Sequence, residues 1–485
     1  MAGAAFFDLD RTLLQGASGP VMSDALRSVG VITSAKTPIE DALFGVFDLV
    51  GETRPSMMLA RLGVRFSKGW DAERVAEAGQ SAAEQLVPMI QPYARQLIEW
   101  HRLEGRKVVM ATTSPMTMCG PLAELLELDD VIATSYGVKG GKYDGTVDGH
   151  YVWGPGKRDA VKEWSEANDI DLDDSYAYSD SRYDLPLLRS VGHAVAVNPD
   201  PRLKVLATGL GWPVLYLDVP AGVPKVAGVE PVEAAMSVVR PELTPYARFD
   251  IDGTDFIPKT GPAILAANHR SYFDPLVIAF ALARAGRSGR FMAKKEVDDA
   301  PIIGSSVKSA GTIRVDRGSG SSGPLDAAAS ALEAGEVVVI LPQGTIPRGH
   351  DFFDPVLHGR PGVAKLAVMT GAPVIPLGLF GSEEVWPRSA KLPAVWNVTA
   401  PPRVRVRVGE AVDLSALTKG AKTTKKTGRK SVSAKKETAI VAEIMSSIVD
   451  LLPDEAREEI EPTEEQLART QPSGKSSAKE AAVAT

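Results

Sequence analysis

Two series of short apolar segments, each interleaved with helix-like segments, constrain the fold of this chain more than any other feature. Strand-length apolar runs separated by helices are typical of parallel sheets whose strands are joined by helical crossovers. The first series consists of AAFFDLD, KVVMATTS, DVIATSY, SYAYSD and HAVAVN, and the second of AILAAN, GTIRV, EVVVILP, APVIPLGLF and RVRVRVG. The sequence therefore predicts two α/β domains, each built on its own sheet.

A Pro- and Gly-rich stretch, DVPAGVPKVAGVEP, separates the two series. The 485 residues suffice for two or three domains. We predict a first domain over residues 1–215, a linker over 216–240 and a second domain over 241–415. Residues 16–95 are mostly helix-like and far longer than an ordinary crossover, which indicates an inserted helical cap. Segment 416–485 begins with a Lys-rich run, continues with a helix-like stretch and is expected to end in a disordered tail.

Composition and charge exclude several classes of protein. The formal net charge of −7 gives no reason to expect a nucleic-acid partner. The single cysteine, Cys119, excludes an intramolecular disulfide framework and a multi-cysteine metal site, and we expect a buried, inert thiol. The N-terminus lacks the features of a secretory signal, and the apolar run PLVIAFALA has about half of the ~18 residues that a membrane-spanning helix needs. We therefore expect a cytoplasmic protein with peripheral contacts to the cytoplasmic face of the membrane.

Four aspartates follow two of the strands in the first series. Asp8 and Asp10 come after AAFF, and Asp180 and Asp184 come at the end of SYAYS and shortly after it. Open parallel sheets bind ligands at the carboxyl ends of their strands. Two carboxylates there can hold Mg²⁺, and one can attack phosphorus. An isolated Asp-x-Asp is more simply a polar turn, and Asp184 before Leu-Pro is equally a helix cap.

Two further residues complete a set that suits phosphoryl transfer. Thr112 follows the strand KVVMA and can donate a hydroxyl hydrogen bond, and Lys157 in WGPGKRDAV supplies a compact positive charge. Transfer to a carboxylate needs such groups because nucleophile and phosphate are both anionic. Lys157 by itself is also compatible with a solvated surface side chain.

In this order, the four motifs resemble those of the haloacid dehalogenase-like phosphatases, in the branch that includes phosphoserine phosphatase. The resemblance covers about residues 1–210 and implies a Rossmann-like core with a helical cap. Arg11 stands where many relatives carry Gly. The resemblance also implies that Asp8 is the nucleophile and that Asp10 is the general acid and base. Thr112 and Lys157 would bind the phosphoryl group. Mg²⁺ would be held by Asp8, Asp180 and the Asp10 main-chain carbonyl, with Asp184 supporting the site.

The stretch ANHRSYFDPLVIAF opens the second series. The strand AILAAN runs into His269, and Asp274 with Pro275 is a favourable helix start, with Asp274 as N-cap. This simple structural interpretation needs no catalysis. A short loop can also fold the Asp274 carboxylate onto the His269 imidazole, which selects its tautomer and makes the other nitrogen a base for an alcohol.

Three later stretches, GTIRVDR, LPQGTIPRG and APVIPLGL, follow in order. With NHRSYFD they resemble the four blocks of the glycerophospholipid acyltransferases, most of all those that act on 1-acylglycerol-3-phosphate, over about residues 245–412. The resemblance implies that His269 deprotonates a glycerol hydroxyl that attacks an acyl thioester directly, while Asp274 orients His269. The substrate phosphate would bind at the second and third blocks, at Arg317, Gly344, Thr345 and Arg348.

The third block departs from the family pattern. Relatives usually read Glu-Gly-Thr-Arg, whereas this chain has Gln343 and Ile346 at the first and last positions. Lys294 and Lys295 in FMAKKE are further candidates for the phosphate side, or else the solvated start of a helix. Arg348 lies two residues after Ile346, which occupies the position of the usual arginine.

Together the two resemblances imply a bifunctional enzyme. The second domain would convert lysophosphatidic acid to phosphatidic acid with acyl-CoA or acyl carrier protein as donor, and the first would be a Mg²⁺-dependent phosphomonoester phosphatase. Two alternatives stay open: a first domain that only binds a phosphorylated metabolite and regulates, and an acyltransferase that acts on another lysophospholipid. The Lys-rich run over residues 419–436 is expected to bind anionic membrane surfaces or to serve as a solvated linker.

Overall fold

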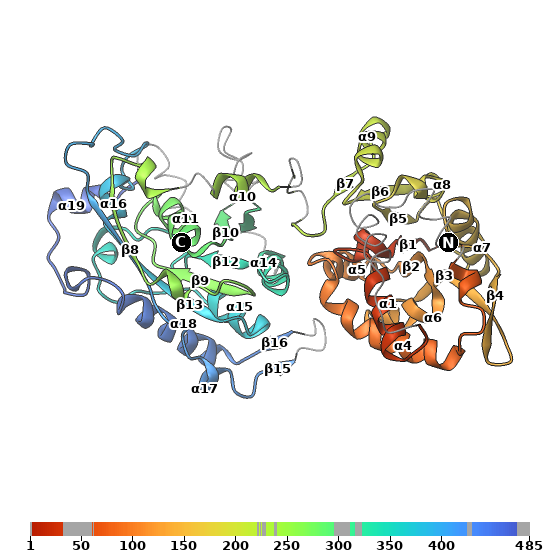
Figure 1. Ribbon diagram of the computed structural model, residues 1–485. Helices are drawn as coiled ribbons and strands as arrows, with labels where there is room; N and C mark the ends of the chain where they lie inside the picture. Colours follow the sequence, from red (N-terminus) through yellow and green to blue (C-terminus); the bar gives the residue numbers. More distant parts are fainter. Residues whose placement is uncertain are drawn as a thin grey trace. The chain divides into compact units, whose positions relative to one another are not determined.

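The computed structural model of this protein describes residues 2–32, 61, 63–220, 223, 225, 229–236, 240–294, 311–315, 323–423 and 429–472. The chain divides into two compact units, Met1–Ala221 and Gly222–Thr485 (Figure 1). Each unit contains one seven-stranded sheet. The prediction of two α/β domains is thereby confirmed.

The sheet of the first unit has the strand order β4-β3-β2-β1-β5-β6-β7. Neighbouring strands are parallel except β3 and β4, which form an antiparallel edge that the sequence did not predict. The short apolar strand β1 lies in the middle and is buried throughout, as expected of a strand covered on both faces. The strands are β1 (Ala4–Phe7), β2 (Lys107–Pro115), β3 (Asp130–Lys139), β4 (Lys142–Asp148), β5 (Tyr176–Ser179), β6 (His193–Val197) and β7 (Val214–Leu215).

Helices cover both faces of this sheet. Because side chains alternate along a strand, Val108 and Met110 pack under one layer of helices and Val109 and Ala111 under the other. The first layer consists of α1 (Gly19–Ser28), α4 (Ala72–Leu86), α5 (Ala94–Leu103) and α6 (Met116–Leu125), and the second of α7 (Pro155–Ala167), α8 (Leu185–Leu188) and α9 (Pro201–Leu210). Short helical turns are η1 (Leu9–Leu13), η2 (Val87–Met89) and η3 (Arg182–Asp184).

The described part of the predicted cap packs on this same core. Helices α1 and α4 contribute Met22 and Val75 to the cluster that contains strand residues of β1 and β2. At Gly79 of α4 a Cβ would overlap the carbonyl oxygen of Thr117, so glycine permits close contact with α6. Residues 33–60 and 62 of the predicted cap lie outside the described residues. Cys119 is buried, and burial raises its pKa to about 12, as expected of an inert thiol.

The sheet of the second unit has the order β11-β10-β12-β9-β13-β14-β8. It is parallel except for the antiparallel pair β13 and β14. The sequence did not predict β8 and β10; Lys294 ends β10 rather than starting a helix, and Lys295 lies outside the described residues. The strands are β8 (Arg248–Asp252), β9 (Ala263–Ala267), β10 (Gly289–Lys294), β11 (Ile313–Val315), β12 (Val337–Ile340), β13 (Val374–Phe380) and β14 (Arg403–Val408).

The core of the second unit extends beyond residue 415, where the strand and helix pattern of the sequence fades. Helix α18 presents Ile440, Ile444 and Ile448, spaced by one helical turn, to the cluster that contains Ile264 of β9. One face of the sheet is covered by α14 (Gly323–Glu333), α15 (Gly362–Thr370) and α18 (Ala434–Val449), and the other by α11 (Asp274–Ala285). Smaller elements are α10 (Pro231–Met236), which lies within the predicted linker, η4 (Pro241–Leu243), η5 (Thr254–Phe256), η6 (Gly349–Phe352), α16 (Ser382–Val385), α17 (Ser415–Thr418), β15 (Lys422–Thr423) and β16 (Lys430–Ser431).

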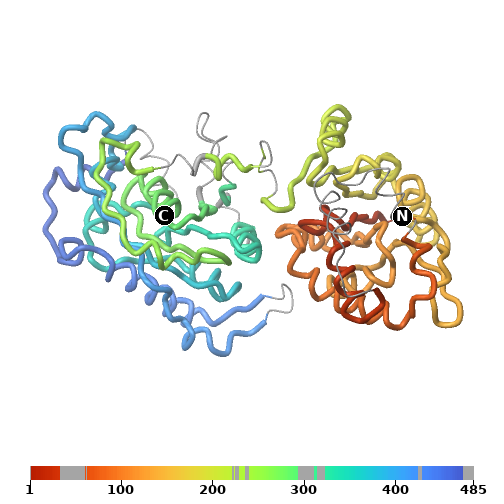
Figure 2. The backbone as a smooth tube through the Cα atoms, viewed as in Figure 1, coloured from red at the N-terminus to blue at the C-terminus, as the bar shows by residue number. Residues whose placement is uncertain are grey.

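The chain after α18 returns along the second unit, as the dark blue end of the tube in Figure 2 shows. It contains η7 (Asp454–Ala456) and α19 (Glu464–Arg469), which begins with a capping box at Thr463. The Arg469 carbonyl accepts a hydrogen bond from Ser389 N, and Thr470 Oγ1 accepts one from Gly349 N. The C-terminal segment is therefore packed on the second unit as far as this helix, and residues 473–485, at the end of the predicted tail, lie outside the described residues. Among the described residues, no helix combines the length and the apolar character that spanning a bilayer requires.

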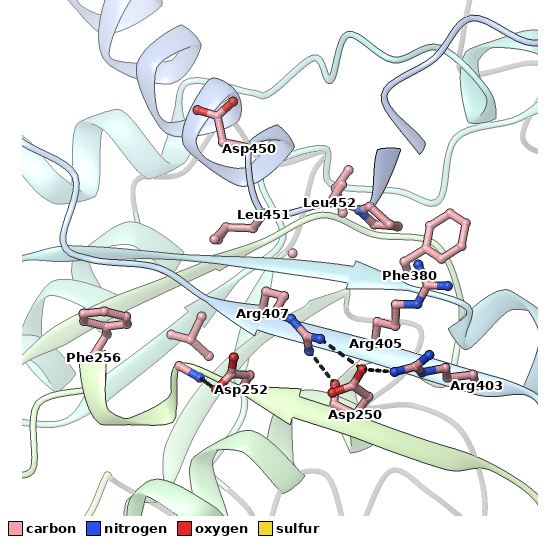
Figure 3. Close-up of a pocket in the computed structure, with 14 residues that line it drawn as sticks. Asp250, Asp252, Phe256, Phe380, Arg403, Arg405, Arg407, Asp450, Leu451 and Leu452 are labelled. Atoms are coloured by element: carbon pink, nitrogen blue, oxygen red, sulfur yellow. Dashed lines mark hydrogen bonds and ion pairs between the residues drawn. The ribbon is translucent and has the colours of Figure 1, made fainter. Parts of the chain in front are cut away.

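Three arginines at alternate positions of β14 face a hollow of ≈ 690 Å³, whereas the valines between them are buried (Figure 3). Asp250 Oδ2 of β8 accepts hydrogen bonds from Arg403 Nη2 at 2.6 Å and from Arg407 Nη2 at 3.0 Å. Arg405 pairs with Glu455 at 2.9 Å. The arginines therefore tie the edge strand β8 and the C-terminal segment to β14.

We predict that Asp250→Asn lowers the unfolding free energy by about 1 kcal/mol or less at pH 7, because both pairs are partly exposed. The hydrogen bond from Arg407 and the nearby guanidinium charges lower the pKa of Asp250. A carboxyl whose pKa is lower in the folded state stabilises it above the unfolded pKa of about 4, and this contribution is lost as pH falls through the folded pKa.

Urea unfolding from pH 7 to pH 3 measures the difference in unfolding free energy between wild type and Asp250→Asn. Asp252→Asn is the control, because the hydrogen bond of that carboxylate comes from the backbone N of Gly253 and not from an arginine. A difference between wild type and Asp250→Asn that stays constant over the whole pH range contradicts the prediction.

Two candidate active sites

Asp8 and Asp180 lie at the same edge of the first sheet. Asp8 directly follows β1 and Asp180 directly follows β5, the neighbouring parallel strand. Asp8 N donates to the carbonyl oxygen of Tyr178 at 3.0 Å, which extends the ladder by one residue. Both carboxylates are buried, at 8% and 3% relative exposure. The parallel register therefore brings together two acids that are far apart in the sequence.

Lys157 is a buried member of this site rather than a solvated side chain. Its relative exposure is 0%, and its Nζ donates to Asp8 Oδ1 at 2.8 Å and to Asp184 Oδ2 at 2.7 Å. Ser179 Oγ donates to the same oxygen of Asp184 at 2.8 Å. Asp184 occupies the N-cap position of α8, but its side chain makes no capping bond. Its carboxylate instead holds Lys157 against Asp8.

Asp10 lies in the turn η1 that follows Asp8. Its Oδ1 accepts a hydrogen bond from Ser18 N at 2.5 Å. Desolvation raises the pKa of Asp10, and the hydrogen bonds from Ser18 and the charges of Lys157 and Arg11 oppose this effect. A carboxyl with a raised pKa holds a proton more readily than an ordinary aspartate does.

Arg11 belongs to the site although sequence reasoning assigned it no role. Its φ of 58° is in the left-handed region, which costs a non-glycine residue roughly 1 kcal/mol. Its backbone is held by Asn198 Nδ2, which donates to the Arg11 carbonyl at 3.0 Å, and its Nη2 contacts Asp180 Oδ2 at 2.9 Å. The only available signal in the sequence was the arginine in place of the usual glycine.

Thr112 and Thr113 lie near the carboxyl end of β2, where the pairing with β3 has a register shift between Thr112 and Pro115. Thr112 is buried, and its Oγ1 accepts a hydrogen bond from Ser114 N at 3.2 Å. A hydroxyl that accepts a hydrogen bond can still donate its own proton. The Thr112 hydroxyl that the sequence singled out is therefore compatible with the predicted role on the phosphoryl group.

Thr113 lies within this irregular part of β2. Its Oγ1 is buried and has no hydrogen-bond partner within the part of the chain that the structure describes. Leaving a buried hydroxyl unsatisfied costs free energy, so a ligand oxygen at this point would be stabilised. Sequence reasoning missed Thr113 because two adjacent threonines look alike in the sequence, and only the unpartnered hydroxyl in the folded chain distinguishes it.

The donor set at this edge has the chemistry of a magnesium site. It offers two carboxylates, Asp8 and Asp180, together with the peptide carbonyl of Asp10. Mg²⁺ prefers such oxygen donors and is bound by one or two carboxylates while it keeps several waters. Over the described ranges, no group of three or more His, Cys, Asp or Glu side chains forms a metal cluster. Two carboxylates and one peptide carbonyl nevertheless fit a sparsely coordinated Mg²⁺ that keeps several waters.

The second site is centred on His269, just beyond the carboxyl end of β9. His269 Nδ1 lies 2.8 Å from Asp274 Oδ2. The Asp274 side chain is fully buried, and that of His269 is 16% exposed. Because an ionised carboxylate only accepts hydrogen bonds, Nδ1 carries the proton, and Nε2 is left with its lone pair.

Asp274 serves this loop rather than the helix. Phe273 is the N-cap of α11 and Asp274 its first residue, which corrects the expected capping role. Asp274 Oδ2 also accepts from Arg270 N at 2.7 Å and from Ser271 N at 2.8 Å. The turn closed by Asp274 N and the Ser271 carbonyl directs these N–H groups inward. The carboxylate is consequently surrounded by hydrogen-bond donors of its own loop.

The third sequence block anchors the same loop. Gln343 Oε1 accepts a hydrogen bond from His269 N at 2.7 Å, a role that needs only an acceptor oxygen and that a glutamate could equally fill. Gly344 adopts a φ of 71° in a turn closed by its N–H and the Leu341 carbonyl. Thr345 is partly buried, and Arg348 precedes η6. Arg317 lies outside the described residues.

Arg270 connects the loop that follows β9 to a cavity of ≈ 350 Å³. It pairs with Glu383 at 2.7 Å and lies over the ring of Phe352 at 4.4 Å. The cavity is also lined by residues of the C-terminal segment, among them Leu452 and Thr470. Sequence reasoning missed these neighbours because nothing local relates them to the loop.

Comparison with known proteins agrees with this geometry in both units. The family model described as haloacid dehalogenase-like hydrolase matches residues 5–189, and the model described as Acyltransferase matches residues 248–379. A probable phosphatase of Mycobacterium tuberculosis is 35% identical over 219 residues, which cover 45% of this chain and 76% of the relative. The chain is a fusion of a haloacid dehalogenase-like hydrolase and an acyltransferase.

Other relatives match the hydrolase domain. A histidinol-phosphatase of Neisseria meningitidis is 32% identical over 229 residues, which cover 44% of this chain and 99% of the relative. A structure of phosphoserine phosphatase with an analogue of the phospho-aspartyl intermediate matches at 20% identity and a TM-score of 0.34, over 44% of this chain and 93% of the other.

A solved acyltransferase structure is also similar to this chain. The 1-acyl-sn-glycerophosphate acyltransferase from Thermotoga maritima matches at 21% identity and a TM-score of 0.32, over 45% of this chain and 80% of the other.

Proposed function

We propose that this fusion protein catalyses two separate reactions. The acyltransferase domain transfers an acyl group from acyl-CoA or acyl carrier protein to 1-acylglycerol-3-phosphate, which gives phosphatidic acid. The hydrolase domain releases phosphate from a phosphomonoester. The observation that carries the first proposal is the 2.8 Å contact between His269 Nδ1 and the buried Asp274. The second rests on Lys157, which is fully buried between Asp8 and Asp184.

In the acyl transfer, His269 acts as general base. Its Nε2 takes the proton of the acceptor hydroxyl while that oxygen attacks the thioester carbonyl. The carbon–sulfur bond then breaks, and the leaving thiolate takes this proton from Nε2, which returns His269 to its neutral form. Asp274 stabilises the imidazolium that forms, and Gln343 holds the loop. We assign the acceptor phosphate to Arg317, Gly344, Thr345 and Arg348 at the second and third blocks.

In the phosphatase reaction, an Asp8 carboxylate oxygen attacks phosphorus and forms an aspartyl-phosphate, which water then hydrolyses. Lys157 offsets the negative charge that accumulates, and Asp184 keeps Lys157 in place. Asp10 gives a proton to the leaving group and takes one from the attacking water. Mg²⁺, when bound by Asp8, Asp180 and the Asp10 carbonyl, supplies further positive charge at the phosphoryl group.

We assign the phosphoryl-binding hydroxyl to Thr113 rather than to Thr112. Thr113→Val is expected to lower the rate of phosphate release about 10²-fold, the effect of losing one donor to a developing charge. Thr112→Val is the matched variant and should have the smaller effect, since Thr112 Oγ1 already has a partner in Ser114 N, whereas the buried Thr113 Oγ1 has none among the described residues. Initial rates of phosphate release from both variants check this assignment, and the reverse order of effects would return the role to Thr112.

The experiment that tests the proposed function supplies the purified protein with lysophosphatidic acid and either acyl-CoA or acyl carrier protein, and measures phosphatidic acid. In parallel, phosphate release is measured with and without Mg²⁺ from phosphoserine, histidinol phosphate, glycerol phosphates and lysophosphatidic acid. We expect phosphatidic acid with at least one donor and Mg²⁺-dependent release from at least one phosphomonoester. Release from none of them would favour a hydrolase domain that binds a phosphometabolite without turning it over.

We propose further that the Lys-rich run holds the protein at anionic membrane surfaces. Lys419, Lys422, Lys430 and Lys435 are exposed. Replacing all four by Gln should weaken sedimentation with anionic vesicles by roughly 1 kcal/mol per lysine, most visibly at low salt. Substitution is preferable to deletion, because Val432 and other residues of this segment pack against the core. Neutral vesicles serve as control, and unchanged binding to anionic vesicles would exclude this role for the run.

A further inference from the structure

Ser382 reaches the catalytic pair from a distant part of the chain. It is fully buried at the start of α16, and its Oγ donates to Asp274 Oδ1 at 2.5 Å. The turn between β13 and α16 passes through Gly381, whose φ is 88° and where a Cβ would overlap the carbonyl oxygen of Arg403. Glycine therefore lets the chain turn tightly enough to aim Ser382 at Asp274.

The two oxygens of Asp274 are held by different elements. Oδ2 accepts from the ring of His269 and from the N–H groups of Arg270 and Ser271, all within one short loop. Oδ1 accepts from Ser382, which is 108 residues away in the chain. Rotation about the Cβ–Cγ bond moves both carboxylate oxygens, so every hydrogen bond at Oδ1 or Oδ2 opposes it. The bond from Ser382 adds a restraint on the oxygen that the short loop leaves unheld.

The same element also holds the loop itself. Ser271 Oγ donates to the carbonyl of Trp386 at 2.6 Å, and the rings of Tyr272 and Trp386 contact each other edge to face. The loop after β9 is thus attached to the residues after β13 at several points, which include the pair of Arg270 with Glu383. Of these, the Ser382 bond is the one that touches the group in contact with His269.

We propose that Ser382 is a positioning residue of the acyl transfer. Its hydroxyl locks the Asp274 carboxylate in the plane that receives His269 Nδ1–H, so that Nε2 points at the acceptor hydroxyl. This inference rests on the proposed acyltransferase function. Such a residue acts only through Asp274, whereas a serine that merely fills the core acts on stability and not on turnover.

Three variants test the proposal: Ser382→Ala, Ser382→Thr, and Ser382→Ala combined with Asp274→Asn. We expect Ser382→Ala to lower kcat about 10- to 100-fold, the range of effects for a misplaced catalytic group, with KM changed less than about twofold. Ser382→Thr keeps the hydroxyl and should recover most of the turnover. On the Asp274→Asn background, Ser382→Ala should change kcat less than about twofold, because the group through which it acts is already altered.

The outcomes separate this proposal from the function on which it rests. The unfolding midpoint reports whether each variant is folded, and Ser382→Cys replaces Ser382→Ala under the same criteria if the alanine variant does not fold. A folded Ser382→Ala variant with wild-type kcat overturns the role of Ser382 and leaves the proposed function standing. The same holds if the effects of Ser382→Ala and Asp274→Asn on kcat are fully additive. Wild-type protein that transfers no acyl group to lysophosphatidic acid overturns the proposed function, and the role of Ser382 with it.

Discussion

Asp8→Asn is expected to reduce phosphate release by at least about 10³-fold, the scale of losing a nucleophile, while acyl transfer continues. Asparagine keeps the shape of the side chain but lacks the charge that attacks phosphorus. It also removes one carboxylate from the set that would hold Mg²⁺ and leaves Lys157 with one anionic partner fewer. Three requirements of the proposed chemistry fail at once, so this is the largest effect that we predict for the hydrolase domain.

Acyl transfer should persist in this variant because every residue assigned to that reaction lies in the second compact unit, which begins at Gly222. Asp148→Asn, the same substitution at an exposed aspartate of β4, is the matched control. Both activities are measured on each purified variant after its unfolding midpoint is compared with wild type. If folded Asp8→Asn protein loses acyl transfer, the two domains are coupled, and the reading of two independent sites is wrong.

His269→Ala is expected to lower the rate of acyl transfer by about 10²- to 10⁴-fold, the typical contribution of a general base. The loop should keep its path, because Gln343 bonds the backbone N–H of residue 269, which alanine retains. Asp274 likewise keeps the hydrogen bonds from Arg270 N, Ser271 N and Ser382. The loss therefore measures the base and not a collapsed loop.

Phosphate release should be unaffected in His269→Ala protein. His358→Ala is the matched control, since the His358 side chain is 83% exposed. Initial rates of phosphatidic acid formation and of phosphate release are compared for the three proteins. Retention of more than about a tenth of the acyl transfer rate by His269→Ala would contradict a general base at this position.

The sequence by itself determined the features that follow from local backbone geometry or from the rules of parallel sheets. His269 and Asp274 lie on one short loop, so their contact needs no other part of the fold. Asp8 and Asp180 follow two apolar strands, and the carboxyl ends of parallel strands share one edge of a sheet. Two α/β domains were predictable for the same reason, because the alternation of strands and helices is written along the chain.

Only the tertiary structure decided which distant groups meet these residues. Gln343 and Ser382 reach the catalytic loop from 74 and 108 residues away, and no local pattern relates them to it. Folding gives Thr112 Oγ1 a partner in Ser114 N and leaves the buried Thr113 Oγ1 without one among the described residues, a difference that two adjacent threonines do not show in the sequence. Helix α18 joins the second core because its apolar stripe packs on a sheet whose strands all precede it in the sequence. Spacing along the chain sets local contacts, whereas sheet order, register and packing set the contacts between distant residues.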